Sequence, residues 1–156
     1  RIAKKIGECE WLLCASPDYL EKYGTPQQPK DLMNHRCFIF SFASPWNKWA
    51  FIQDGLGVTT PVKPRGSFTQ GELLRDMAKS GAGIVRLADF HIGKDIQEGS
   101  LVLLLDEYKA EIREPIYLLY SDRKHLSPRI RVFIEFFHEK WIAHPWNVVR
   151  GLPEAT

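Results

Sequence analysis

Short apolar runs alternate along the chain with segments in which apolar residues recur at helical spacing. Short runs bounded by polar or turn residues are typical of buried strands, and apolar residues three or four positions apart are typical of helices. Strands are predicted at 10–15, 36–40, 83–87, 100–106 and 114–121. Because these apolar strands alternate with helices, the pattern predicts an α/β fold.

Capping residues mark where several helices begin. Ser16 followed by Pro17 predicts the start of a short helix. Thr69 and Glu72 have the spacing of a capping box, which predicts another helix start. Further helices are predicted at 29–34 and at 88–99, the latter ended by Gly99.

The most regular helical pattern opens at Ser127-Pro128. Its apolar stripe is expected to lie in the core and consists of Ile130, Phe133, Phe137 and Trp141. The following residues, 143–156, show no clear period and are expected to form a loosely ordered tail.

A hairpin is predicted between the segments 47–52 and 57–64. They flank a glycine-rich turn sequence, Asp-Gly-Leu-Gly at 54–57. Pro61 and Pro64 have no backbone N–H to donate to a neighbouring strand. The second strand is therefore expected at a sheet edge or with an irregular course.

Composition narrows the class of protein without identifying it. With 156 residues, 44% hydrophobic and 26% charged, the chain can bury a core, and its net charge of +2 gives no argument for nucleic acid or anionic membranes. The longest apolar run, 101–105, is far shorter than the roughly 18 residues of a membrane span. The basic amino end lacks the apolar segment of a signal peptide.

The cysteine count is odd, which argues against a disulfide framework. Cys9, Cys14 and Cys37 are expected to be reduced thiols, mostly buried, rather than a disulfide or a metal site. Reduced thiols favour a cytoplasmic protein.

The sequence fits none of several common catalytic patterns. His138 and His144 are six positions apart, not the four that place two zinc ligands on one helix face. The segment 66–71 lacks the spacing of a nucleophile elbow, and 81–86 lacks that of a dinucleotide fingerprint. The sequence therefore predicts no enzyme, no metal and no cofactor.

One local feature suggests a binding site for an anion. Where an irregular strand meets a helix start, unpaired N–H groups and the helix dipole favour a carboxylate. The residues at this junction are Ser67, Phe68, Thr69 and Gln70. The alternative is that Ser67 or Thr69 only caps its own helix. Arg86 is unusual inside an apolar strand, and either pairs with Asp89 or faces a ligand cleft.

A set of short motifs occurs in a specific order. They are Ser-Pro-x-Tyr-Leu at 16–20, Gly-x-Pro at 24–26, Pro-x-Asp-Leu at 29–32 and His-x-Cys at 35–37, followed by longer similar stretches at 78–105 and 120–139. In this order they resemble the effector domain of LysR-type transcriptional regulators, from about residue 1 to residue 139.

The resemblance implies a fold like that of type II periplasmic binding proteins, with two α/β lobes, two crossing strands and a ligand cleft between the lobes. The implied division is the end of lobe one with the first crossing strand at 1–14, lobe two at 15–112, the return crossing and closing helix at 113–142, and a tail at 143–156. The family's winged helix-turn-helix, linker helix and first part of lobe one are expected to be missing from this sequence.

The resemblance also suggests which residues bind the effector. Ser67, Phe68 and Thr69, with Gln70, are expected at the cleft, and Ser16, Phe40, Phe42 and Arg86 are further candidates. Trp46 and Trp49 either wall a pocket for an aromatic or hydrophobic acid or pack within their own lobe.

The function implied is that of the effector-sensing part of a cytoplasmic, homo-oligomeric transcriptional regulator. Its effector is expected to be a small organic anion, and DNA would be bound only through the missing domain. One rival interpretation is the solute-binding protein of a transporter. Another is an enzyme acting on prephenate or arogenate, which would need a catalytic acid and binding arginines.

Overall fold

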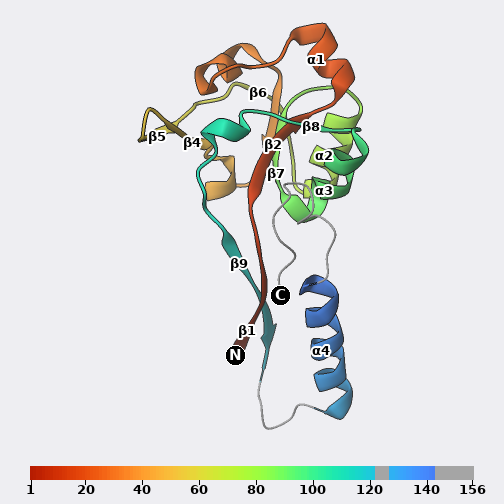
Figure 1. Ribbon diagram of the computed structural model, residues 1–156. Helices are drawn as coiled ribbons and strands as arrows, with labels where there is room; N and C mark the ends of the chain where they lie inside the picture. The colour runs from red at the N-terminus through yellow and green to blue at the C-terminus, as the bar shows by residue number, and fades with distance from the viewer. Residues whose placement is uncertain (122–126, 143–156) are drawn as a thin grey trace.

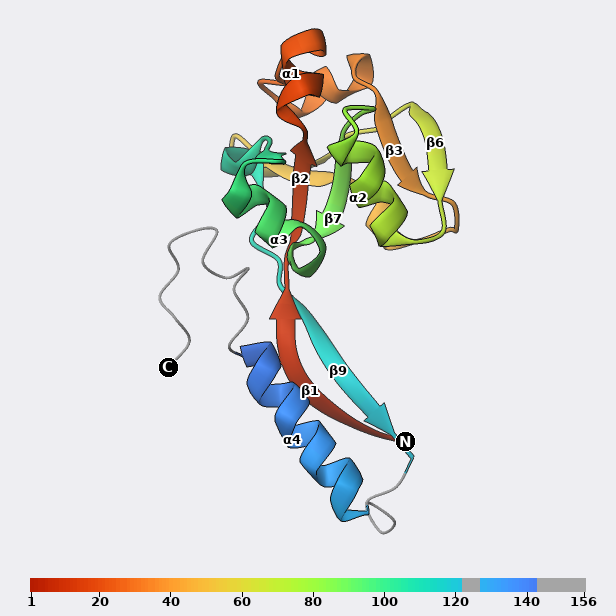
Figure 2. The ribbon, with the colours of Figure 1, turned by 90° about the vertical axis from the view of Figure 1, so that its right-hand side faces the viewer.

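The computed structural model describes residues 1–121 and 127–142, and Figure 1 shows two parts. An upper body, residues 11–112, contains most of the helices and strands. Below it a long ribbon of two strands, β1 (Ile2–Cys9) and β9 (Glu114–Tyr120), lies beside the helix α4 (Pro128–Ile142), as Figure 2 shows from the side. The expected tail at 143–156 lies outside the described residues.

A mixed sheet forms the centre of the upper body. Its strands are β2 (Trp11–Ala15), β3 (Cys37–Phe40), β6 (Pro64–Phe68), β7 (Val85–Ala88) and β8 (Val102–Leu103). β2 pairs antiparallel with both β7 and β8, and β3 pairs parallel with β6. A parallel bridge from Cys37 to Ile84 joins the two groups in the order β6-β3-β7-β2-β8. This mixed α/β architecture confirms the predicted fold class.

Both faces of β2 are buried, which explains its unbroken apolar run. Leu12 and Cys14 pack in a cluster with the helices α2 (Gly71–Lys79) and α3 (Asp89–Glu98). Leu13 and Ala15 face the other way, into a second apolar cluster on the opposite side of the sheet. Side chains alternate between faces along a strand, so consecutive apolar residues indicate cover on both sides.

The elements on the second face are shorter. They are α1 (Pro17–Tyr23), the 3₁₀ turns η1 (Pro29–Asn34), η2 (Pro45–Asn47) and η3 (Asp106–Tyr108), and the hairpin β4 (Ala50–Gln53) with β5 (Leu56–Thr59). Ser16 caps α1 as predicted, its hydroxyl oxygen accepting a hydrogen bond from the Tyr19 amide at 3.1 Å.

The predicted hairpin is confirmed, with a tighter turn than expected. Asp54 and Gly55 have positive φ angles of 52° and 76°, as in a two-residue type I′ turn. The first strand begins at Ala50 rather than at 47, because Pro45–Asn47 forms a 3₁₀ turn.

The predicted strand at 100–106 is mostly wrong. Only Val102–Leu103 forms a strand, pairing with Cys14 and Ala15 of β2. Leu104 and Leu105 pack in the second apolar cluster, and the Leu104 amide donates to the Leu13 carbonyl of β2 at 2.9 Å. The apolar run therefore indicated burial correctly at Leu101, Leu104 and Leu105 but not at the exposed Val102, and most of it is not a strand.

The predicted capping box at Thr69 and Glu72 is also wrong. Gln70 still has extended backbone, with φ −129° and ψ 140°, so α2 begins at Gly71. Glu72 is then the second residue of the helix instead of the third, where a capping box requires it. No side chain caps this helix start among the described residues.

The lower part consists of β1 (Ile2–Cys9), β9 (Glu114–Tyr120) and α4 (Pro128–Ile142). The two strands pair antiparallel from Ile2 with Tyr120 to Cys9 with Glu114. The register shifts between Lys5 and Gly7. The sequence did not indicate β1 as a strand, because charged residues interrupt its apolar positions.

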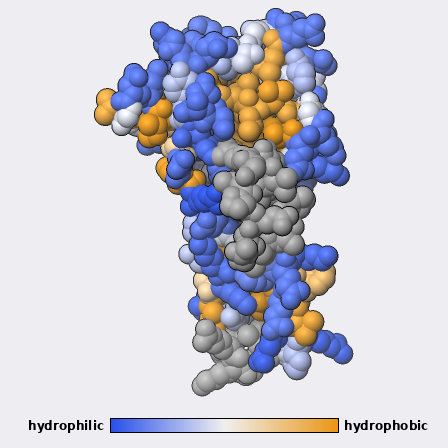
Figure 3. All heavy atoms as spheres, viewed as in Figure 1, coloured by the Kyte–Doolittle hydropathy of each residue, from blue (hydrophilic) through white to orange (hydrophobic). Residues whose placement is uncertain are grey.

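The apolar stripe of α4 is not a core stripe in the described part of the chain. Ile130 and Phe133 are 46% and 57% exposed, and the buried apolar residue of this helix is Ile134, 5% exposed. α4 packs on β1. The ribbon that β1 forms with β9 has two strands and is too narrow to cover a full helix face. Apolar side chains are visible among polar ones at this end in Figure 3. The side chain of Trp141 lies outside the described set.

The cysteine prediction is confirmed. Cys9, Cys14 and Cys37 are free and buried. Within the described ranges no helix is both long and apolar enough to cross a bilayer.

Candidate functional site

A cavity of about 390 Å³ lies where three parallel strands end. Parallel strands of open α/β sheets characteristically place ligand sites outside their carboxyl ends. The lining residues lie at or just after the ends of β3, β6 and β7 and at the junction of β1, β2 and β9. They are Cys9, Trp11, Phe40, Phe42, Trp46, Thr69, Gly71, Phe90, His91, Glu114, Pro115 and Ile116. The cavity is therefore bounded by the upper body on one side and by the ribbon on the other.

Four aromatic rings form one wall of this cavity. The Trp46 ring lies 5.1 Å from that of Trp11, 5.5 Å from Phe40 and 6.1 Å from Phe42, measured between ring centroids. Offset or edge-on aromatic pairs at these separations stabilise one another. The wall is suited to the apolar or aromatic body of a small molecule.

Asn47 holds this wall in place. Its side chain accepts a hydrogen bond from the Phe40 amide at 2.9 Å and donates to the carbonyls of Phe40 and Phe42 at 2.8 and 3.2 Å. The short turn that carries Asn47 is capped by Ser44, whose hydroxyl accepts from the Trp46 amide. The aromatic residues are therefore positioned by local hydrogen bonds as well as by packing.

The start of α2 forms another part of the lining. Thr69 and Gly71 line the cavity, and the first turn of α2 has no side-chain cap among the described residues. The first N–H groups of an uncapped helix point at whatever lies beyond its end. This corner can accept a negatively charged group.

His91 lies directly against this corner. A Cβ on Gly71 would come within 2.7 Å of the His91 ring, so only glycine lets the imidazole pack this closely. Burial lowers the pKa of His91. The ring is therefore neutral near pH 7, when it carries one N–H donor and one acceptor.

The ribbon side of the cavity carries Cys9 and Glu114, which pair across β1 and β9. Burial raises the pKa of the Cys9 thiol to about 12, so this cysteine is a neutral thiol and not a nucleophile at physiological pH. Glu114 is the acidic residue of the lining.

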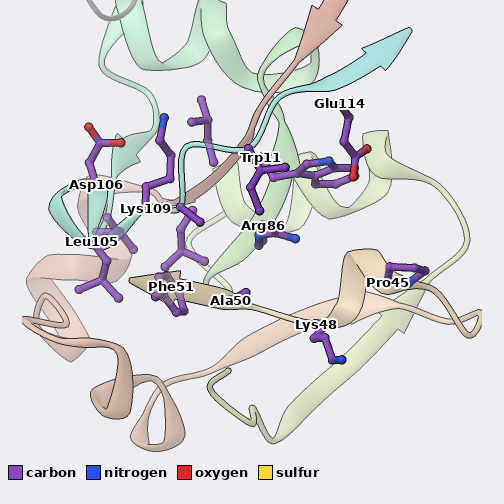
Figure 4. A pocket seen from close by; sticks show the side chains of 15 residues that line it. Trp11, Pro45, Lys48, Ala50, Phe51, Arg86, Leu105, Asp106, Lys109 and Glu114 are labelled. Carbon is purple, nitrogen blue, oxygen red and sulfur yellow. The ribbon is translucent and has the colours of Figure 1, made fainter. Parts of the chain in front are cut away.

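A second, smaller cavity of about 190 Å³ lies next to the first, with Trp11 and Glu114 lining both. Figure 4 shows Arg86 near the centre of its lining residues. The Arg86 guanidinium lies 5.4 Å from the centroid of the Trp11 ring and donates to the Trp46 carbonyl at 3.3 Å. Arg86 forms no ion pair with Asp89, so of the two alternatives the structure places it in a cavity.

The structure separates the residues singled out in the sequence. Thr69, Phe40 and Phe42 come together at the larger cavity, and Arg86 lines the smaller one. Ser67 and Gln70 are exposed beside Thr69 without lining either cavity. Phe68 packs against Phe38 with 6.2 Å between ring centroids, and Ser16 caps α1 at the far end of β2. Effector contacts by all eight residues stay predictions.

The two tryptophans take different positions, and ligand contact by either stays a prediction. Trp46 is 38% exposed and lines the larger cavity, whereas Trp49 is 2% exposed and packs in the second apolar cluster. They lie in one short loop, but only the structure shows that they face opposite ways.

Eight lining residues were not indicated as site residues in the sequence: Cys9, Trp11, Gly71, Phe90, His91, Glu114, Pro115 and Ile116. Phe90 and His91 follow the end of β7, so the rule that sites gather at the carboxyl ends of strands would have indicated them. Trp11 and Glu114 lie close together only because β1 and β9, which are far apart in the sequence, pair and enter the upper body together. No local sequence pattern indicates this contact.

Residues 2–142 match the LysR substrate binding domain. The chain belongs to this family. Its members have the fold of type II periplasmic binding proteins, as the resemblance implied.

Individual relatives agree with this assignment. The chain is 36% identical over 138 residues to the HTH-type transcriptional regulator CrgA of Neisseria meningitidis, covering 88% of this chain and 46% of that protein. It is 30% identical over 135 residues to the HTH-type transcriptional activator AaeR of Escherichia coli, covering 85% and 42%. The chain thus spans less than half the length of these relatives.

Solved structures give the same result. The CrgA regulatory domain from Neisseria meningitidis matches with a TM-score of 0.84 at 35% identity, over 90% of this chain and 68% of that one. The regulatory domain of AphB from Vibrio vulnificus matches with a TM-score of 0.70 at 31% identity, over 87% and 67%. The chain is therefore an effector-binding domain of the LysR type. These relatives are regulators rather than enzymes, and the transporter interpretation is not supported.

Proposed function

We propose that the larger cavity binds a small organic acid and that its occupancy controls the arrangement of the upper body and the ribbon. The observation that carries this proposal is the position of the cavity. Its walls come from both parts, so one small molecule would contact Phe42 and Trp46 on one side and Ile116 on the other. Such a ligand binds one arrangement of the two parts more tightly than another and shifts the population towards it.

The lining supports a ligand with an apolar or aromatic body. A cavity of about 150 Å³ holds a benzene molecule, so about 390 Å³ accommodates a ring with substituents. The aromatic wall would contact the body of such a ligand.

The charge of the ligand follows from the polar lining. A carboxylate would accept hydrogen bonds from the first turn of α2 and from the Thr69 hydroxyl. Neither Lys nor Arg is among the described lining residues, and Glu114 would repel a second negative charge on the ribbon side. We therefore propose a monoanion rather than a dicarboxylate.

In the longer protein this event would be transmitted to DNA. We propose that residues 15–112 form the second lobe, and that 1–14 and 113–142 contribute the crossing strands and part of the first. Ligand binding would bias the lobes of a cytoplasmic homo-oligomer, and a helix-turn-helix domain, as in the HTH-type relatives, would respond.

The test is a titration of aromatic and aliphatic monocarboxylates, followed by isothermal calorimetry. Thr69→Val keeps the shape of the side chain and removes the hydroxyl, and should weaken binding about 3- to 30-fold. Thr59→Val makes the same change on the exposed strand β5, outside the cavity, and should leave the affinity unchanged. Equal affinities for the two variants would contradict the proposed site.

A further inference from the structure

The smaller cavity contains a cation without a counterion among the described residues. Arg86 is half-buried, and the ion pairs of this region do not include it. A guanidinium has five N–H donors, and one hydrogen bond is present, from Nη1 to the Trp46 carbonyl. Among the described residues the remaining donors have no protein acceptor, so they are available to a ligand that enters the cavity.

The neighbouring charges do not neutralise Arg86. Lys109 also lines the smaller cavity, and it is already paired with Glu10. Lys48 is exposed at the rim and adds positive charge. Asp106 and Glu114 also line the cavity, but neither lies within 4.0 Å of Arg86 as an ion pair. Burial lowers the pKa of Arg86, and the charge of Glu114 opposes this effect.

The rest of the lining is apolar. It includes Leu104, Leu105, Phe51 and Ile112. At about 190 Å³ the cavity is slightly larger than one of about 150 Å³ that binds benzene. An acid with a short hydrocarbon chain has the size and polarity that this space requires.

We propose that this cavity is a second binding site, for a short-chain monocarboxylate whose two oxygens pair with the Arg86 guanidinium. Carboxylate and guanidinium form two parallel hydrogen bonds in this geometry. The hydrocarbon chain would lie against Leu105 and Ile112. The site goes beyond the proposed function, because it uses other residues and a separate cavity.

The experiment uses the Trp11 indole as a reporter. Trp11 stacks on Arg86, so its indole N–H resonance, identified by its loss in Trp11→Phe, would shift when a carboxylate binds. Sodium propionate is titrated against sodium chloride at equal ionic strength. A saturable shift with propionate and none with chloride is expected. A shift that is linear, or the same for both salts, would overturn the proposal.

Matched variants assign the effect to a residue. Arg86→Met should weaken propionate binding at least about tenfold, since a charged hydrogen-bonded pair is lost. Arg65→Met, the same change at an exposed position on β6, should leave it unchanged. Unchanged binding in Arg86→Met would overturn the site.

Two further variants cover the case in which Arg86→Met does not fold. Glu114→Gln removes a negative charge near the site and should tighten propionate binding about 2- to 5-fold. Weaker or equal binding would contradict the proposal. If Thr69→Val abolishes the shift instead, propionate occupies the larger cavity, and this inference fails while the proposed function stands.

Discussion

Arg75 and Asp95 join the two helices on one face of the sheet. The Arg75 guanidinium donates from Nε and Nη2 to the two carboxylate oxygens of Asp95, at 2.6 and 3.0 Å. Lys79 pairs with the same carboxylate at 3.0 Å, and the Ser100 hydroxyl donates to it at 3.1 Å. Asp95 is 2% exposed, so this buried charge is fully paired.

Asp95→Asn is expected to destabilise the domain by about 1.5–3 kcal/mol. The amide is nearly the same size, but it loses the charge that balances Arg75 and Lys79. Asp76→Asn makes the same change at an exposed position on α2 and should cost less than about 0.5 kcal/mol. Urea unfolding of both variants gives the comparison, and equal stabilities would refute the role of Asp95.

Acid should destabilise the domain partly through the same residue. Burial alone would raise the pKa of Asp95, but hydrogen bonds from Arg75, Lys79 and Ser100 together lower it below the ordinary 3.8. The stabilisation is present above pH 3.8 and is lost as the pH falls below that value towards the folded pKa. Unfolding measured between about pH 6 and 2.5 should be less pH-dependent in Asp95→Asn than in the parent, and parallel curves would contradict this.

Tyr19→Phe is expected to cost about 1–3 kcal/mol. The buried Tyr19 hydroxyl hydrogen-bonds with His35 Nδ1 at 2.7 Å and accepts from the Arg36 amide at 3.1 Å, tying α1 to the start of β3. The control is Tyr23→Phe on the same helix, where the side chain is exposed. Thermal unfolding should distinguish the two, and similar melting temperatures would show that the hydroxyl has no such role.

Gly71→Ala should alter the larger cavity without unfolding the domain. The added methyl group would lie 2.7 Å from the His91 ring, which must move. We expect the His91 ring resonances to shift and the affinity for a cavity ligand to fall about 3- to 10-fold. Gly57→Ala adds a methyl group where nothing lies within 4 Å, and should change neither. An unmoved His91 resonance in Gly71→Ala would disprove the contact.

Local chemistry explains which parts of the fold were predictable. The run Leu12–Ala15 indicated a strand covered on both faces, and Asp54-Gly55 indicated a tight turn, because both depend on neighbouring residues. Residues 101–105 look like a strand by the same criterion, but only Val102–Leu103 forms one, and Val102 is exposed. The exposed Phe133 shows a similar limit, since a helical stripe becomes core only where another layer covers it.

The sequence likewise indicated those residues of the candidate site that depend on local pattern, and not those that depend on long-range pairing. Thr69 and Phe40 lie at or near the ends of strands that can be read from the sequence, so they were identified. Trp11 and Glu114 acquire their positions from long-range pairing of β1 with β9. Both residues line the two cavities, and this division has no signature in the sequence.

The paired strands β1 and β9 constrain how the two parts of the molecule can move. Since the strands are hydrogen-bonded to each other up to Cys9 and Glu114, they enter the upper body as one element rather than as two independent linkers. Sliding one strand past the other would break the ladder, whereas twisting the pair would not. The irregular register between Lys5 and Gly7 is a point where such a ribbon twists more easily. Relative motion of the two parts would therefore be a torsion about one axis.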